Sequence, residues 1–411
     1  MDFYQALLAD FRAHLWLYLS MPVVAAVIGY VTKLVAIRMM FEPIEFVGIK
    51  PFLGWQGIVP RRAERMASIA CDTMTARLIS PKEIFGRMDP DRVVQEIEKP
   101  LLADVEEITR EVMDVYAPKL WEMLPEGIRQ AVLKRVKDEA PGIVKQIMAD
   151  VKANIDSVFD LKSMVVGHLV GQKPLLNRIF RESGREEFKF IARSGIYFGS
   201  VIGVVQMVTW MFTHSAIIMP LFGLFTGWFT DWLALKMVFR PREPRRFFGV
   251  FSWQGLFLKR RKEVAAEYGG LIAREVITPE NIFEEVLKGP LSDRLLVMIQ
   301  NHVQRMVDQQ AGLAKPIVVF AVGTERYREM KRLVVLKTIA RLPKTLKHVE
   351  PYAADAMDIR NTLVTKLQDM TPAEFEGILR PAFQQDEWIL IAVGAALGFL
   401  VGEMQVFLML H

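Results

Sequence analysis

The sequence has a single cysteine, Cys71, among 411 residues, which excludes a disulfide within the chain and says little about the compartment. Its six histidines stand singly, at positions 14, 168, 214, 302, 348 and 411. None is four residues from another, which excludes a His-Glu-x-x-His zinc motif. A Gly-Lys-Ser/Thr phosphate loop, a dinucleotide glycine fingerprint and a nucleophile elbow are also missing. We therefore expect no metal, no cofactor, no catalytic residue and no enzymatic activity.

Long stretches of the chain lack Lys and Arg. Residues 194–235 contain no Lys or Arg and one carboxylate, that of Asp231. Residues 15–31 have no ionisable group except tyrosine, and residues 388–410 have only Glu403. A bilayer core of about 30 Å takes about 20 helical residues. The sequence therefore predicts four transmembrane helices, near residues 15–40, 191–213, 215–239 and 387–410.

A signal peptide is the alternative interpretation of residues 15–31. The preceding residues carry Arg12 against Asp2 and Asp10, which is not the basic start that a signal requires. No clean small-x-small cleavage site follows. The transmembrane interpretation is therefore favoured.

Basic residues gather on one kind of flank of the predicted helices. They are Lys50, Arg61, Arg62 and Arg65 after the first helix, Lys189 and Arg193 before the second, and eight between Arg240 and Lys262 after the third. The turn at 213–220 and the tail after Glu387 have none. By the positive-inside rule, we expect a multi-pass protein of the bacterial cytoplasmic (inner) membrane, with both large hydrophilic segments cytoplasmic. The orientation would reverse if those segments were exported.

The isoelectric point near 9.1 admits two kinds of acidic partner. Nucleic acid is one, and anionic lipid head groups are the other. Because the basic clusters adjoin the apolar spans, we expect membrane lipids and no nucleic acid. Protein partners of the hydrophilic segments are also possible.

The chain contains an internal repeat. A shift of 198 residues aligns 29–85 with 227–283 without a gap, and 16 of those 57 positions are identical. A second match, one residue out of step, aligns Gly195, Gly199, Gly203 and Gln206 with Gly394, Gly398, Gly402 and Gln405. The sequence thus predicts two copies of one unit.

After an N-terminal tail at 1–14, the first copy, 15–213, comprises helix 15–40, a helical segment 60–188 and helix 191–213. The second copy, 214–411, comprises helix 215–239, a helical segment 258–386 and helix 387–410. Each copy crosses the membrane an even number of times, so the copies are parallel, related by an axis along the membrane normal. The expected fold class is an all-α membrane protein with two helical cytoplasmic segments.

Two equivalent positions of the repeat carry opposite charges, Lys33 and Asp231. A charge within a span costs roughly 2.5–3.5 kcal/mol on insertion scales unless it is paired or reaches water. One hypothesis is that the two side chains face each other across the pseudo-twofold axis. The other is that each reaches the membrane interface separately. Three more polar residues are expected within the membrane: Gln206, Gln405 and Glu403, whose carboxyl group could carry a proton or be satisfied by an amide.

Glycines recur every fourth residue in two predicted helices, as Gly195, Gly199 and Gly203, and as Gly394, Gly398 and Gly402. Such stripes allow helix backbones to approach closely in lipid, where packing drives association. We therefore predict that both stripes lie at helix–helix contacts. The alternative is that these glycines are filler residues.

The motifs of this repeat resemble a known family. The stretches "GYVTKLVAIRMMFEP", "GWFTDWLALKMVFRP", "WQGIVPRR" and "DEWILIAVGAALGFLVGEMQ" are similar to bacterial YheB/YjiN-type membrane proteins, a domain of unknown function. The resemblance covers nearly the whole chain. It implies an Asn after the motif threonine, where this chain has Lys33 and Asp231, so no family role carries over to either residue. The resemblance implies no reaction, cofactor or substrate.

The segments 60–188 and 258–386 show apolar residues at three- and four-residue spacing, which predicts amphipathic helices. Between each segment and the preceding span lies a Trp-Gln-Gly motif followed by basic residues. One interpretation is a clasp for lipid head groups. Its candidate residues are Trp55, Arg61, Arg62, Trp253, Lys259 and Arg260. The other is that a buried tryptophan braces a turn.

These features are typical of a membrane scaffold or envelope-maintenance protein that binds lipids or partners through its helical cytoplasmic body. The alternative is a transporter or lipid-handling protein that uses the four-helix bundle as its path. Transport predicts a polar cavity lined by Lys33, Asp231, Glu403, Gln206 and Gln405, whereas scaffolding predicts a tight, dry bundle. The sequence identifies no substrate and no oligomeric state.

Overall fold

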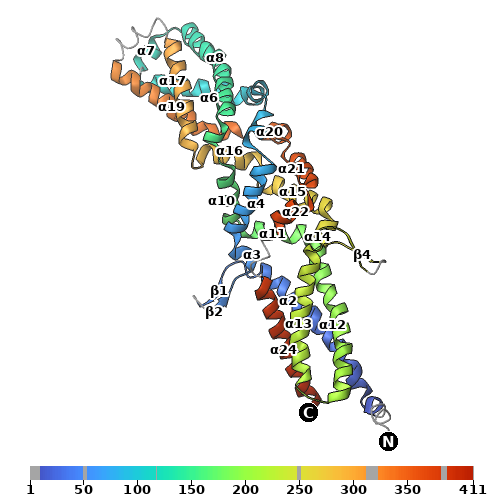
Figure 1. Ribbon diagram of the computed structural model, residues 1–411. Helices are drawn as coiled ribbons and strands as arrows, with labels where there is room; N and C mark the ends of the chain where they lie inside the picture. The colour runs from blue at the N-terminus through green and yellow to red at the C-terminus, as the bar shows by residue number, and fades with distance from the viewer. Residues whose placement is uncertain are drawn as a thin grey trace. The chain divides into compact units, whose positions relative to one another are not determined.

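A computed structural model describes residues 10–49, 53–116, 118–247, 251–311, 323–380 and 387–410 of the chain. Apart from two short β-hairpins, all regular elements of these residues are helices (Figure 1). They form two compact units. The first, here called the membrane unit, comprises residues 1–70, 169–271 and 364–411, and the second unit comprises residues 71–168 and 272–363.

Four helices of the membrane unit are long and apolar enough to cross a membrane, as predicted: α2 (Leu15–Phe41), α12 (Arg185–Thr213), α13 (Ile218–Phe239) and α24 (Glu387–Leu410). Helix α12 begins six residues before the predicted boundary at 191. The sequence prediction was based on the apolar span, and the first turns of this helix are polar. It ends at Thr213, and the next residue, His214, has a left-handed φ of 47°. The turn that follows moves the start of α13 from the predicted residue 215 to 218.

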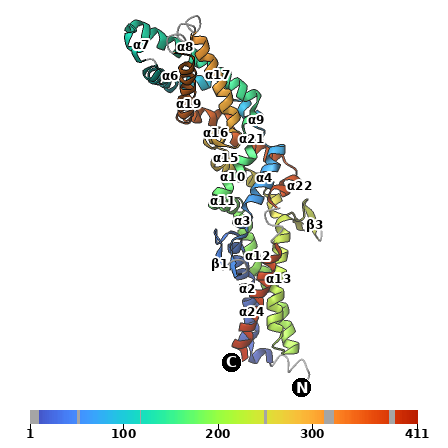
Figure 2. The same ribbon diagram turned by 90° about the vertical axis from the view of Figure 1, so that its left-hand side faces the viewer.

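The four helices pack as two antiparallel pairs, α2 with α12 and α13 with α24 (Figures 1 and 2). Further contacts join α12 to α13 and α2 to both α13 and α24. Large apolar side chains cover the outward faces; they include Val23, Val27, Val201, Phe212, Leu221, Trp228, Leu400 and Phe407. An exposed apolar band of this kind suits a surface in contact with lipid tails.

The two hairpins were not predicted and are a small departure from an all-α fold. Strand β1 (Val47–Ile49) pairs with β2 (Leu53–Trp55), and β3 (Arg245–Phe247) pairs with β4 (Phe251–Trp253), both antiparallel. Each strand has three residues, too few to produce a recognisable alternating pattern. Each hairpin follows a membrane helix directly and leads into a short helix, α3 (Ile58–Arg61) or α14 (Leu256–Lys259).

Four helices contain residues of both units: α4 (Ala63–Arg77), α10 (Leu161–Gly171), α15 (Arg261–Glu275) and α21 (Ile359–Asp369). The membrane unit is completed by α11 (Lys173–Ser183) and α22 (Pro372–Leu379). The second unit contains α5 (Pro81–Gly86), α6 (Pro90–Tyr116), α7 (Pro118–Met123), α8 (Glu126–Ala153), α9 (Ile155–Val158), α16 (Pro279–Lys288), α17 (Ser292–Ala311), α19 (Thr324–Leu346) and α20 (Glu350–Met357).

Helices α5 and α16 begin with the same cap. The Ser80 side chain accepts a hydrogen bond from the Glu83 N–H at 3.1 Å, and the Thr278 side chain accepts one from the Asn281 N–H at 3.2 Å. A proline follows each cap at the first helical position, where its missing N–H costs nothing. The two caps stand 198 residues apart, at the start of "SPKEIF" and "TPENIF".

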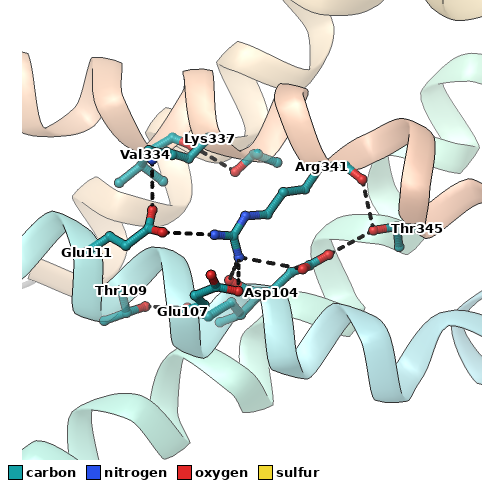
Figure 3. Close-up of polar contacts among 10 residues, drawn as sticks. Asp104, Glu107, Thr109, Glu111, Val334, Lys337, Arg341 and Thr345 are labelled. Atoms are coloured by element: carbon teal, nitrogen blue, oxygen red, sulfur yellow. Dashed lines mark hydrogen bonds and ion pairs between the residues drawn. The ribbon is translucent and has the colours of Figure 1, made fainter.

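The core of the second unit lies among α6, α8, α17 and α19. It encloses an apolar cavity of about 190 Å³. On one side of it, Arg341 of α19 lies among carboxylates of α6 (Figure 3). Its guanidinium donates to Glu107 at 2.8 Å and to Glu111 at 3.1 Å, and lies 3.6 Å from Asp104. These ion pairs connect two helices more than 200 residues apart in the chain.

Candidate functional site

Lys33 of α2 and Asp231 of α13 are in direct contact inside the helix bundle. Lys33 Nζ donates a hydrogen bond to Asp231 Oδ1 over 3.3 Å. The two side chains are 1% and 4% exposed, so neither reaches solvent or the outer surface of the bundle. Each charge is therefore held by the other within a low-dielectric environment, where Coulomb attraction is strong. The contact agrees with the hypothesis that the two side chains face each other. It does not agree with the alternative, in which each side chain reaches the membrane interface separately.

Gly394 makes room for this ion pair. A side chain at Gly394 would overlap Asp231 Oδ2. That oxygen is buried and accepts no hydrogen bond within the described part of the chain. The glycine thus has a second role beyond helix packing, because it admits the carboxylate between α13 and α24.

The six glycines of the two stripes lie at helix–helix contacts. In the α2–α12 pair, a side chain on Gly195, Gly199 or Gly203 would overlap the backbone of Gly29, Ala25 or Pro22. In the α13–α24 pair, Gly398 and Gly402 face the backbone of Gly223 and Met219 in the same way. Both pairs therefore pack backbone against backbone, which leaves little space between the helices.

The three other predicted intramembrane polar residues lie in different environments. Gln206 is buried and its amide nitrogen lies 2.9 Å from Met219 Sδ of α13, so it joins neighbouring helices. Gln405 is also buried, and its amide nitrogen has no hydrogen-bond partner among the described residues. Glu403 is exposed on the outer face of α24. Among the described residues, neither Glu403 nor the two glutamines form a hydrogen bond or ion pair with Lys33 or Asp231.

The glutamine and glycine of each Trp-Gln-Gly motif close the hairpin onto its membrane helix. Gln56 Nε2 donates to the Ile44 carbonyl at 2.8 Å, and Gln254 Nε2 donates to the Arg242 carbonyl at 3.0 Å. Gly57 packs against the last residues of α2, where a side chain would overlap the backbone. Gly255 packs in the same way against α13. Two residues of the motif thus brace a turn.

The tryptophans of these motifs are half-buried. Trp253 Nε1 donates to the Arg240 carbonyl at 3.3 Å, and its ring lies 5.9 Å from that of Phe190. Trp55 Nε1 is buried and has no hydrogen-bond partner among the described residues. A half-buried indole next to a membrane helix suits both interpretations of the motif.

The predicted basic head-group residues do not all face solvent. Arg61 and Lys259 are exposed, and Arg62 is half-buried. Arg260 donates to Glu187 at 3.0 Å and to Glu263 at 2.9 Å. Because Glu187 is only 1% exposed, Arg260 serves to neutralise a buried carboxylate rather than to offer its charge outward.

Sequence reasoning missed a basic cavity at the end of α13. It has a volume of about 620 Å³, and its lining includes Lys236, Arg240, Arg242, Arg245 and Trp253. These cations lie in the last turn of α13 and in the residues directly after it, which was a usable signal: the basic cluster predicted the orientation and a lipid partner, but no cavity. The acidic residue that organises them, Glu376, is 134 residues from Arg242, and no local pattern points to it.

Comparison with known proteins gives partial matches to membrane proteins. A UPF0754 membrane protein of a Nostoc species is 38% identical over 74 residues, which are 18% of each chain. One from Microcystis aeruginosa is 29% identical over 137 residues, covering 33% of this chain and 27% of the relative. One from Bacillus cereus is 32% identical over 94 residues, covering 22% and 25%. The chain therefore matches less than a third of the length of these relatives.

No family model matches the chain, and no solved structure matches it. The relatives are named as UPF0754 proteins and not by the YheB/YjiN label, so that resemblance stays a prediction. Their name agrees with the four apolar helices of the membrane unit. The chain is a membrane protein, similar over part of its length to bacterial UPF0754 membrane proteins of unassigned function.

Proposed function

We propose that this protein is a scaffold of the bacterial cytoplasmic membrane that holds a helical cytoplasmic body at the bilayer and binds anionic lipids and protein partners there. The observation that carries the proposal is the contact between Lys33 and Asp231 inside a glycine-packed bundle. A bundle closed in this way resists the opening that transport requires. It suits a rigid anchor.

The architecture proposed for this scaffold is a pair of parallel repeats. Equivalent glycines contact equivalent backbones in the two helix pairs: Gly195 meets Gly29, and Gly394 meets Gly227. The two glutamines of the Trp-Gln-Gly motifs also make equivalent hydrogen bonds. These correspondences support duplication, and the basic residues beside both hairpins support a cytoplasmic location for the hydrophilic segments.

The alternative of a transporter receives less support. Its path was expected to include five polar residues, among them Glu403, Gln206 and Gln405. Glu403 lies on the exposed face of α24, whereas the ion pair is buried inside. A substrate path through the bundle would have to separate Lys33 from Asp231 and move closely packed backbones apart. We also propose that the protein is not an enzyme.

Flux measurement tests the choice between anchor and transporter. The purified protein would be reconstituted into liposomes, and proton and cation flux would be recorded for the native chain and for Lys33→Gln/Asp231→Asn. A scaffold gives the flux of empty liposomes in both cases. Flux that depends on the native protein and changes in the variant would overturn the proposal.

Cysteine labelling tests the orientation. In a Cys71→Ala background, single cysteines would be placed at exposed positions such as Lys134 and Lys344, one in each hydrophilic segment. An impermeant maleimide added to intact cells should label neither, and should label both after the membrane is opened. Labelling of only one position in intact cells would contradict the parallel arrangement.

A further inference from the structure

The cavity at the end of α13 has the composition of an anion-binding site. Of its nine lining residues, four are basic, and a single one, Glu243, is acidic. Its volume of about 620 Å³ is within the usual range for small-ligand sites. A concave surface with an excess of one charge concentrates ligands of the opposite charge.

A buried carboxylate fixes the arginines of the site. Glu376, which is 3% exposed, accepts a hydrogen bond from Arg242 at 2.5 Å and one from Arg380 at 2.6 Å, and lies 3.6 Å from Arg240. One carboxylate thus holds three guanidinium groups. Because a single negative charge cannot neutralise three positive ones, the cluster has a net positive charge. Planar guanidinium groups held in place can bind phosphate oxygens through paired N–H donors with little loss of entropy.

Two further cations complete the lining. Among the described residues, neither Lys236 nor Arg245 forms an ion pair. Lys236 Nζ lies 4.6 Å from the centre of the Trp232 ring, an arrangement that keeps the ammonium near the apolar helix while leaving its donors available. These two charges are the ones free to meet a ligand.

The equivalent positions in the first half of the chain do not carry the arginines of this cavity. At the equivalent positions, 198 residues earlier, the three arginines of the cavity are replaced by Glu42, Ile44 and Val47. Glu42 accepts a hydrogen bond from Arg38 at 2.9 Å, so charges there are satisfied within the protein. The arginines of the cavity therefore do not follow from the repeated hairpin alone.

We infer that this cavity binds the phosphate of an anionic phospholipid head group. Its cations lie in the last turn of the apolar helix α13 and directly after it, so a ligand there lies at head-group depth once α13 spans the bilayer. Trp253, half-buried beside the cations, has the preference of indole for that layer. The inference rests on the proposed membrane scaffold, because it needs α13 within the bilayer.

Binding of phosphatidylglycerol tests the inference. The full-length protein would be purified in a neutral detergent, incubated with phosphatidylglycerol or phosphatidylcholine, and examined by native mass spectrometry and titration calorimetry. The variant is Lys236→Gln/Arg245→Gln, which leaves the Glu376 cluster intact. The matched control is Arg38→Gln/Arg246→Gln, which removes the same charge at the equivalent first-half position and at an exposed neighbour outside the lining.

The native protein and the control should each retain phosphatidylglycerol in preference to phosphatidylcholine. The variant should bind it about 30-fold more weakly, at roughly one kcal/mol for each basic residue near the membrane surface. An equal loss of phosphatidylglycerol binding in the variant and the control would refute the proposed site. Equal binding of phosphatidylglycerol and phosphatidylcholine by the native protein would also refute it. Glycerol 3-phosphate binding as tightly as the lipid would overturn the lipid as the source of the phosphate. A protein absent from the membrane fraction would instead refute the scaffold proposal.

Discussion

Lys33 Nζ lies 3.3 Å from Asp231 Oδ1, and both side chains are sealed inside the bundle. Burying an ion pair costs desolvation energy that the mutual attraction has to offset. Removing one partner leaves the other charge with no compensation, while removing both removes the cost as well. The pair therefore adds little to the free energy of unfolding. Its main effect is to disfavour any packing of α2 against α13 in which the two charges are apart.

The first prediction concerns this pair. Lys33→Met should lower the free energy of unfolding by about 3–5 kcal/mol, because Asp231 is left buried and unpaired. Lys33→Met/Asp231→Leu should be clearly more stable than the single variant. Thermal unfolding in detergent, followed by tryptophan fluorescence, gives the comparison. Equal losses in the single and double variants would show that the two charges are not coupled.

The second prediction concerns Gly394. Gly394→Ala should destabilise the bundle by about 1–3 kcal/mol, because the new methyl group meets Asp231 Oδ2 and the Gly227 carbonyl. The matched control is Gly142→Ala in α8, where an added methyl group meets nothing within 4 Å. That change should stabilise the helix by about 0.5–1 kcal/mol. Opposite shifts in melting temperature are expected, and shifts of the same sign would contradict the packing argument.

The third prediction concerns Arg341 in the second unit. Arg341→Gln should cost about 1–3 kcal/mol, because it strands carboxylates of α6 that Arg341 now satisfies (Figure 3). Arg110→Gln should cost less than about 0.5 kcal/mol, because Arg110 pairs with Glu106 on the same exposed helix face. Amide hydrogen exchange in α6 and α19 would measure both effects. Equal protection in the two variants would refute a structural role for the Arg341 cluster.

The fourth prediction concerns pH. Burial raises the pKa of Glu376, but hydrogen bonds from Arg242 and Arg380 outweigh it, and the pKa lies below the ordinary 4.5. A lowered carboxyl pKa gives stability that is present above 4.5 and lost as the pH falls through the folded-state value. The melting temperature should therefore drop on acidification below this point. Glu376→Gln should reduce the slope, and an unchanged slope would argue against the cluster.

The fifth prediction concerns the only cysteine. Burial raises the pKa of Cys71 to about 12, so little thiolate is present at neutral pH. Alkylation by iodoacetamide should be slow in the folded protein and fast in denaturant, as measured by intact mass. Rapid alkylation of the native chain would show that α4 and α10 separate around Cys71 in solution.

Features that depend on residues close together in the chain could be predicted from the sequence, and most features that depend on distant residues could not. The four membrane helices follow from long runs without charge, and the glycine contacts follow from four-residue spacing on one helix. The Lys33–Asp231 contact was accessible only through the repeat, because nothing near either residue indicates its partner. Pairing of equivalent positions supplied the long-range information that a single sequence usually lacks.

Other features depend on contacts that leave no trace in a local pattern. Gly394 belongs to a recognisable stripe, but its role toward Asp231 depends on the side chain of another helix. Glu376 looks like a surface residue of a short amphipathic helix, and only the fold brings Arg240 and Arg242 to it. Arg260 was predicted to contact lipid because it follows a Trp-Gln-Gly motif, and its partner Glu187 is 73 residues away, where no local pattern points to it.

The sequence separation of the central ion pair has a consequence for biosynthesis. Lys33 precedes Asp231 by 198 residues. At ribosomal speeds of about 5–20 residues per second, the lysine leaves the ribosome roughly 10 to 40 s before the aspartate exists. Helix α2 is therefore synthesised well before the carboxylate that pairs with its lysine. Any chain interrupted before residue 231 lacks the carboxylate that neutralises this cation in the finished bundle.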